Sequence, residues 1–213
     1  MYKQDYYGSP SQHQLPGSVL IWKDCWGYCL LCEEEHYMRH LFMRRPTLDD
    51  LPPMPELPTG YTMRDYRPED LDTLSALMRT AFEDPQWTSD KLRRVLIDAP
   101  DVKRIIVIEF AGLPVATASA RLMPDQHPGS GYIHWVAVDP AHRGQRLGTI
   151  VTLACLYAFR EFGCKDAVLE TDDHRLAAIR IYQELGFLPE ERHPSHAERW
   201  AIVIANLLAS ANL

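Results

Sequence analysis

The sequence lacks an excess of positive charge. Its 213 residues include 22 Lys and Arg against 29 Asp and Glu, which gives a formal net charge of −7, and the isoelectric point is near 5.7. Nucleic-acid binding depends on Lys and Arg that neutralise phosphates. This charge balance therefore argues against nucleic acid as a partner, although a local basic patch could still attract a small anion.

Long hydrophobic runs and an oxidised cysteine framework are also missing. The apolar stretches around Leu147–Phe159 and Trp200–Leu208 are too short or interrupted to span a bilayer. The first residues, MYKQDYYGSPSQHQ, contain no apolar core of a signal peptide. The cysteines are odd in number: Cys25, Cys29, Cys32, Cys155 and Cys164. We therefore expect reduced thiols and a cytoplasmic protein with no membrane partner.

Proline is unevenly distributed and suggests how the chain is divided. Five prolines lie between Pro46 and Pro58, a density that disfavours both helix and sheet. We therefore expect a flexible N-terminus (1–17), an N-terminal extension (18–45), a proline-rich connector (46–59) and a main domain (60–213). Within the extension, short strands are expected at 18–24 and 26–31, and helical spacing predicts an amphipathic helix over Glu33–Arg45.

Hydrophobic periodicity in the main domain predicts a mixed α/β fold. We expect strands at 61–66, 103–110, 114–122, 132–138, 167–171, 187–192 and 199–206. Helices are expected at 67–81, 88–96, 144–162 and 174–185. The residues Ala111-Gly112, between two strands, are typical of a hairpin turn.

One stretch, Gly131–Thr149, combines a strand, a turn and a helix start. The apolar segment Tyr132–Val138 is stopped by Asp139-Pro140, because proline cannot donate to a strand ladder. The turn Arg143–Gly148 then opens the long helix. A helix N-terminus presents free main-chain N–H groups and the positive end of the helix dipole, so this turn is suited to a phosphate or pyrophosphate.

Two motifs here resemble a known family. The turn follows the pattern [Q/R]-x-x-G-x-[G/A], with Arg143 first, Gly148 last and Arg146 in place of the middle glycine. Downstream, LETDDHRLAAIRIYQELGF contains A-x-x-[LI]-Y-x-x-x-G-F, matched by Ala178, Ile181, Tyr182, Gly186 and Phe187. Both resemble the GNAT superfamily of N-acetyltransferases. Because Arg146 is not glycine, we expect the turn to adopt a conformation open to ordinary residues there.

The resemblance implies a mostly antiparallel mixed sheet with one splayed parallel strand pair, flanked by helices. It also implies acetyl-CoA as cosubstrate and an amine as acceptor, which attacks the thioester directly within a ternary complex. A non-catalytic acyl-CoA-binding regulatory module is the alternative. The cofactor-binding residues that it implies are Val136, Ala137, Val138, Arg143, Gly144, Gln145, Arg146, Leu147, Gly148 and Thr149.

The resemblance also implies a general acid. Tyr182 corresponds to the tyrosine that protonates the departing thiolate, although a tyrosine at this spacing can equally be a core residue. For the general base, His134 on the central strand and Glu170 on its neighbour are both candidates. A hydrogen-bonded structural side chain is the alternative for either residue.

The N-terminal segment carries ligand types that suit zinc, at Cys25, Cys29, Cys32, His36 and His40. The cysteines lie among apolar residues, so we expect buried thiols and no metal. The same segment could cover the acceptor side or form a homodimer contact. We expect the loops at 82–86, 123–130 and 190–198 to select the acceptor.

Overall fold

The computed structural model describes residues 40–211, with side chains to residue 210. Its strands are β1 (Leu41–Arg45), β2 (Tyr61–Asp65), β3 (Val102–Phe110), β4 (Leu113–Leu122), β5 (Ser130–Val138), β6 (Asp166–Thr171) and β7 (Leu188–Glu190). Its helices are α2 (Leu71–Phe82), α3 (Ser89–Leu92), α4 (Leu147–Glu161), α5 (Leu176–Glu184) and α6 (His196–Ala211), with short turns η1 (Pro68–Asp70), η2 (Arg93–Ile97) and η3 (Pro140–His142).

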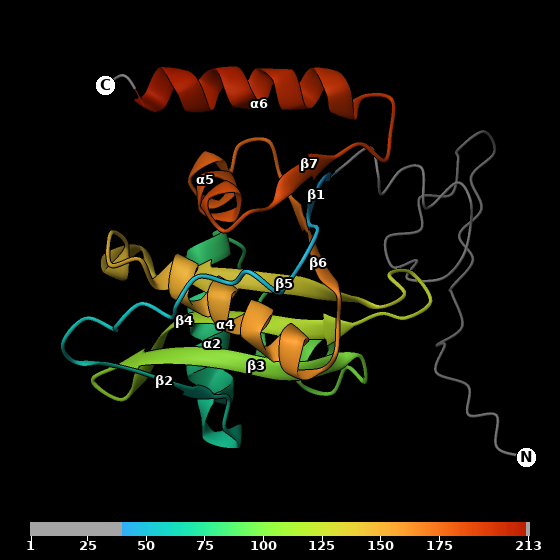
Figure 1. Cartoon of the computed structure of the whole chain (residues 1–213). Coiled ribbons are helices and arrows are strands. Elements are labelled where there is room, and N and C mark those ends of the chain that lie inside the picture. The colour runs from blue at the N-terminus through green and yellow to red at the C-terminus, as the bar shows by residue number, and fades with distance from the viewer. Residues whose placement is uncertain (1–39, 212–213) are drawn as a thin grey trace, which may run out of the picture.

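The strands form one sheet in the order β2-β3-β4-β5-β6-β1-β7 (Figure 1). In the described part of the chain, β5 and β6 run parallel and all other neighbours run antiparallel. This arrangement confirms the predicted mixed, mostly antiparallel sheet with one parallel pair. The Ala111-Gly112 turn between β3 and β4 adopts positive φ at both residues, at 51° and 80°, as a tight hairpin requires.

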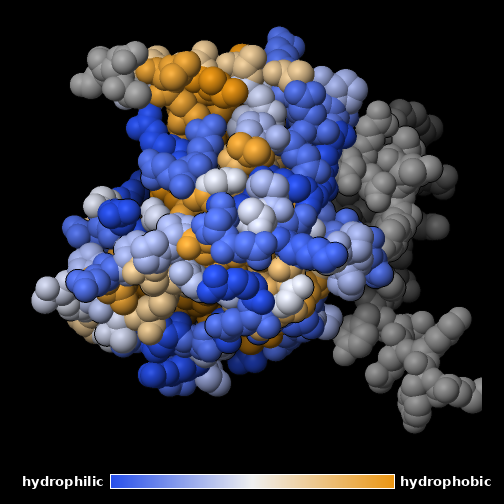
Figure 2. Space-filling model, in the orientation of Figure 1, coloured by the Kyte–Doolittle hydropathy of each residue, from blue (hydrophilic) through white to orange (hydrophobic). Residues whose placement is uncertain are grey.

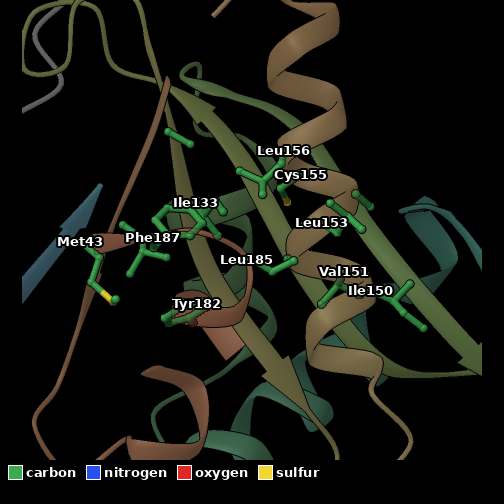
Figure 3. Packing of buried hydrophobic residues seen from close by; sticks show 14 of the residues in the cluster. Met43, Ile133, Ile150, Val151, Leu153, Cys155, Leu156, Tyr182, Leu185 and Phe187 are labelled. Carbon is green, nitrogen blue, oxygen red and sulfur yellow. The ribbon is translucent and has the colours of Figure 1, made fainter. Parts of the chain in front are cut away.

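Helices cover both faces of the sheet because the strands alternate their apolar side chains. Ile106 and Ile108 of β3 join the larger core around α4, whereas Ile105 and Val107 join the smaller core beneath α2. Figure 3 shows the larger core, in which Tyr182 of α5 lies among residues of β1, β5 and α4. The helix α5 packs between α4 and α6.

The prediction of a helix over Glu33–Arg45 is wrong for the residues that the structure describes. Residues 41–45 form β1, which lies between β6 and β7 and is antiparallel to both. Leu41 and Met43 enter the larger core, and Arg44 on the opposite face pairs with Glu190 and Asp166. Pairing on both edges outweighs the weak helical spacing, and these residues belong to the sheet rather than to an extension.

The predicted strand at 199–206 is also wrong, because this segment lies within α6. Trp200, Val203 and Leu207 are buried, and their spacing of three and four residues is helical. The opposite face of α6 is apolar as well, with Ile202, Ile204 and Leu208 exposed. Figure 2 shows this hydrophobic surface along the top of the molecule. An all-round apolar pattern hides the period that distinguishes helix from strand.

The remaining elements differ from the predictions mainly at their ends. The helix expected at 88–96 is α3 followed by the π-helical turn η2, and Thr88 caps it by accepting a hydrogen bond from Lys91 N. The last strand is β7, which is shorter than the predicted 187–192. The strands expected at 18–24 and 26–31 lie outside the described residues. No helix between residues 40 and 211 is long and apolar enough to cross a membrane.

Candidate functional site

The parallel strands β5 and β6 separate part-way along their length. Their pairing extends from Ser130 and Asp166 to Ile133 and Leu169, although β5 continues to Val138. At this point two residues of β5, Trp135 and Val136, lie opposite one residue of β4. Such a bulge turns and twists the strand, and Trp135 accordingly adopts a φ of 51°. Among residues 40–211, no strand pairs with the β6-facing edge of β5 from His134 to Val138, the segment that contains Val136 and Ala137.

The turn after β5 exposes main-chain donors at the start of α4. Across residues 40–211, none of the backbone N–H groups from Gly144 to Thr149 has a hydrogen-bond acceptor, and the first helical bond is Ile150 N to Arg146 O, 3.1 Å. Gly144 has a φ of 80°. Contrary to the sequence expectation, Arg146 is also left-handed, with φ 58° and ψ 16°. Consecutive N–H groups in such a turn form a concave anion site.

The residues of this turn differ in their surroundings: Gly148 is closely packed, whereas the arginines are exposed. A Cβ added to Gly148 would lie 3.3 Å from Ile181 Cδ1 and 3.7 Å from Val138 Cγ2, so glycine here lets α4 approach β5 and α5 closely. Arg143, Gln145 and Arg146 are exposed. Neither arginine forms an ion pair with a described residue, so both guanidinium groups are available to an anion.

Tyr182 lies on α5, on the face of the sheet that α4 covers. Its side chain is 7% exposed and contacts Phe187, with ring centroids 6.0 Å apart. Its hydroxyl makes no hydrogen bond to the described residues. Burial raises the pKa of Tyr182 to about 12, so the hydroxyl keeps its proton throughout the physiological range.

His134 lies on the opposite face of β5, beside Tyr132. Arg121 Nη1 donates to His134 Nδ1 at 2.9 Å, and Asp101 in turn accepts a hydrogen bond from Arg121 Nε at 2.8 Å. Burial, together with the positive charge of Arg121, holds the pKa of His134 well below its usual range. The ring is therefore neutral, and its Nδ1 lone pair is already used.

Glu170 shares this second face. It follows the last β6 residue that pairs with β5, and its negative charge acts on the hydroxyl of Tyr132. Burial, and then the charge of Glu170, holds the pKa of Tyr132 well above its usual range. Tyr132 was missed as a site residue in the sequence, although strand alternation places it on the same face as His134.

The structure places the candidate side chains on the two faces of the sheet. Tyr182 approaches from the α4 side of the sheet, whereas Glu170 and His134 lie on the side of α2. The main-chain donors of the turn lie at the end of β5 where the strands have separated.

The possible zinc ligands of the N-terminal segment, apart from His40, lie outside the described residues. His40 Nδ1 is 3.0 Å from Asp172 Oδ1, and Asp172 also binds Arg175. Between residues 40 and 211, no group of three His, Cys, Asp or Glu residues is placed to hold a metal ion.

Comparison with known proteins assigns the chain to a family. A model of the acetyltransferase (GNAT) family matches residues 69–187. The chain belongs to the GNAT family. Two solved GNAT-type structures share its fold: a GCN5-related N-acetyltransferase from Sphaerobacter thermophilus (TM-score 0.57, 22% identity, 71% of this chain and 49% of that chain), and the ribosomal-protein-S18-alanine N-acetyltransferase from Escherichia coli (TM-score 0.52, 20% identity, 60% and 77%).

Sequence relatives of this GNAT chain are mycothiol acetyltransferases. The protein from Thermobispora bispora is 35% identical over 154 residues, which cover 68% of this chain and 52% of the relative. The protein from Nocardia farcinica is 30% identical over 177 residues, or 76% of this chain and 57% of the relative. The chain therefore spans about half the length of these curated relatives. The family match begins at residue 69, so β1 and β2 lie outside it.

Proposed function

We propose that this GNAT protein transfers an acetyl group from acetyl-CoA to an amine. The run of unpaired N–H groups from Gly144 to Thr149 is the observation that carries this proposal. These groups would hold the diphosphate of the cosubstrate, with Arg143 and Arg146 adding positive charge. The pantetheine arm would follow the unpaired edge of β5 by hydrogen-bonding to Val136 and Val138, as an added strand does.

Candidate acid and base side chains on the two faces of the sheet are consistent with direct transfer of the acetyl group within a ternary complex. A main-chain N–H of β5 would polarise the thioester carbonyl. Tyr182 would donate its proton to the sulfur as the carbon–sulfur bond breaks. Burial raises the pKa of Tyr182 to about 12, so the phenol keeps its proton until the thiolate forms, but it is also a weaker donor than an ordinary tyrosine.

The geometry supports Glu170 as the general base rather than His134. The His134 Nδ1 lone pair accepts from Arg121, which leaves the neutral ring with an N–H at Nε2 and no free acceptor. Glu170 lies on the same face of the sheet, directly after the last β6 residue that pairs with β5, and a carboxylate there can act as a base. Glu170 would therefore take the amine proton, directly or through one water, while His134 is a structural or donor group.

The mycothiol acetyltransferase relatives suggest a small amine as the acceptor, but the chain spans about half their length. The function is tested by free-thiol release from acetyl-CoA with a panel of primary amines and by mass detection of the acetylated product. We expect one acetylated amine per thiol released. Acetyl-CoA binding in calorimetry without acetylation of any amine would instead favour a non-catalytic acyl-CoA-binding module.

A further inference from the structure

The helix α6 is largely apolar on both its inner and its outer face. The inner face is buried at Trp200, Val203 and Leu207. The outer face exposes three large apolar side chains, Ile202 (55%), Ile204 (41%) and Leu208 (64%). No charged residue occurs between Ala201 and Ser210, and the hydrophobic surface extends along the top of the molecule (Figure 2). A helix that is apolar on all sides is normally buried on all sides, so we expect this outer face to have a partner.

The inner face of α6 is held firmly, so the outer face cannot turn inwards. Near the end of the helix, Arg180 Nη2 of α5 donates to Leu207 O at 3.1 Å and to Ser210 Oγ at 2.9 Å. Near its start, Arg199 Nε donates to Asp173 Oδ2 at 3.0 Å. Both ends of α6 are therefore tied to the segment that contains α5, and the apolar outer surface is a fixed feature of the fold.

The size and charge of this surface restrict what can cover it. The 16 residues of α6 form a helix about 24 Å long and roughly 10–12 Å wide. A second copy that docked through α6 alone would cover about 250–300 Å² on each chain, well below the ~1,000 Å² in total that a stable interface needs. A helix that binds a membrane surface carries Lys or Arg, and none lies between Ala201 and Ser210. A segment of the same chain needs less area, because its tether raises the effective concentration.

The described part of the chain begins beside α6. His40 Nδ1 lies 3.0 Å from Asp172 Oδ1, just before α5. The ring of Phe42 stacks on that of His196, the first residue of α6, with centroids 6.1 Å apart. An extended connection of eight residues, such as residues 33–40, spans about 26–29 Å, which matches the length of α6. The residues that precede this connection can therefore reach the whole outer face.

Residues 18–32 have a composition that matches this surface. Their sequence is SVLIWKDCWGYCLLC, in which Lys23 and Asp24 are the only charged residues. Large apolar side chains such as Trp22 and Trp26 gain most from burial.

We propose that residues 18–32 pack on the outer face of α6 in the same chain, so that α6 lies between this segment and α5. The three thiols of the segment are then buried without a metal, as their apolar neighbours indicate. The inference is independent of the acetyl-transfer reaction.

Thiol labelling of the full chain tests whether the segment is covered. The three cysteines of residues 18–32 should react with iodoacetamide much more slowly than in urea, as followed by peptide mass spectrometry. The double variant Ile202→Gln and Leu208→Gln should label these cysteines at least about tenfold faster, because docking loses the burial of two large apolar side chains. The matched control is Leu113→Gln, since Leu113 is 56% exposed in the β3–β4 hairpin, and it should label like the wild type. Equal rates in all three proteins would overturn the inference.

Photo-crosslinking identifies the partner directly and does not rely on the glutamine variants. Benzoylphenylalanine is placed at Ala205, which is exposed on α6, in the full chain. We expect a cross-link to residues 18–32 within one chain, with a yield that does not change with protein concentration. A link between two chains that grows with concentration would assign the surface to a second copy and overturn the inference. A link only to other residues, or no link, would overturn it as well.

Discussion

The two ends of the parallel pair β5–β6 present different parts of the chain to solvent. At the splayed end the exposed groups are main-chain: an unpaired strand edge and a row of N–H groups at the start of α4. At the paired end a pocket is lined by side chains, among them Arg44, His127 and Arg192, drawn from three separate segments. A main-chain site depends on the local conformation of one stretch, so a motif can specify it, whereas a side-chain site depends on how distant segments are brought together.

The largest expected effect lies at the splayed end. Tyr182→Phe should reduce kcat by about 10²-fold or more, the usual contribution of a general acid, and should leave the Kd for acetyl-CoA unchanged. Stopped-flow or steady-state kinetics with calorimetry measures both. Tyr157→Phe is the matched control, since the Tyr157 hydroxyl only donates to Pro52 O on the surface. Wild-type turnover in Tyr182→Phe would show that the phenol is a core group alone.

The choice of base distinguishes the two polar side chains on the acceptor face. Glu170→Gln should lower kcat/KM by about 10²-fold and remove the acidic limb of its pH profile. His134→Gln should keep that limb, because the His134 lone pair is already used by Arg121. The reverse result, with the limb lost only in His134→Gln, would assign the base to the histidine.

The paired end should make stability depend on pH. The pKa of His127 is about 4 when folded, against about 6.5 when unfolded. The unfolded chain therefore binds more protons between these values, and stability falls as pH falls from 6.5 to 4, by up to about 3 kcal/mol. Urea unfolding at several pH values measures this slope. His127→Gln should flatten it, and the exposed control His174→Gln should not; the His134 ring contributes a slope of the same sign.

The smallest effect separates backbone strain from ligand binding. Gly144 and Gly112 both have a φ of 80°, and at both positions an added Cβ would meet only open space. Replacement of either by alanine should cost roughly 1–2 kcal/mol of stability. Only Gly144→Ala should also weaken acetyl-CoA binding, by about tenfold, because it disturbs the N–H row. Equal affinities of the two variants would argue against a phosphate at this turn.

Much of the fold could be predicted from the residues, since alternation and helical spacing identify the elements from Tyr61 to Phe187. The strand β1 could not, because its five residues become a strand only by pairing with β6 and β7 on both sides. The sequence predicts a strand where α6 lies, because apolar residues occur on every face of this helix and hide its helical period. The left-handed Arg146 was also unexpected, since the turn imposes a conformation that the side chain alone disfavours.

The amino-acid sequence alone was enough to predict the row of backbone N–H groups at the start of α4. The strand, turn and helix that form it are contiguous from Gly131 to Thr149, so a short motif identifies them. It also placed Tyr182 by its neighbours in a second motif. Only the tertiary structure decided which side chains face one another: that Arg121 donates a hydrogen bond to His134, that His127 stacks on Tyr132, and that Arg192 and His127 line one pocket. The physical reason is that hydrogen bonds and electric fields act over a few ångströms in space, whatever the separation along the chain.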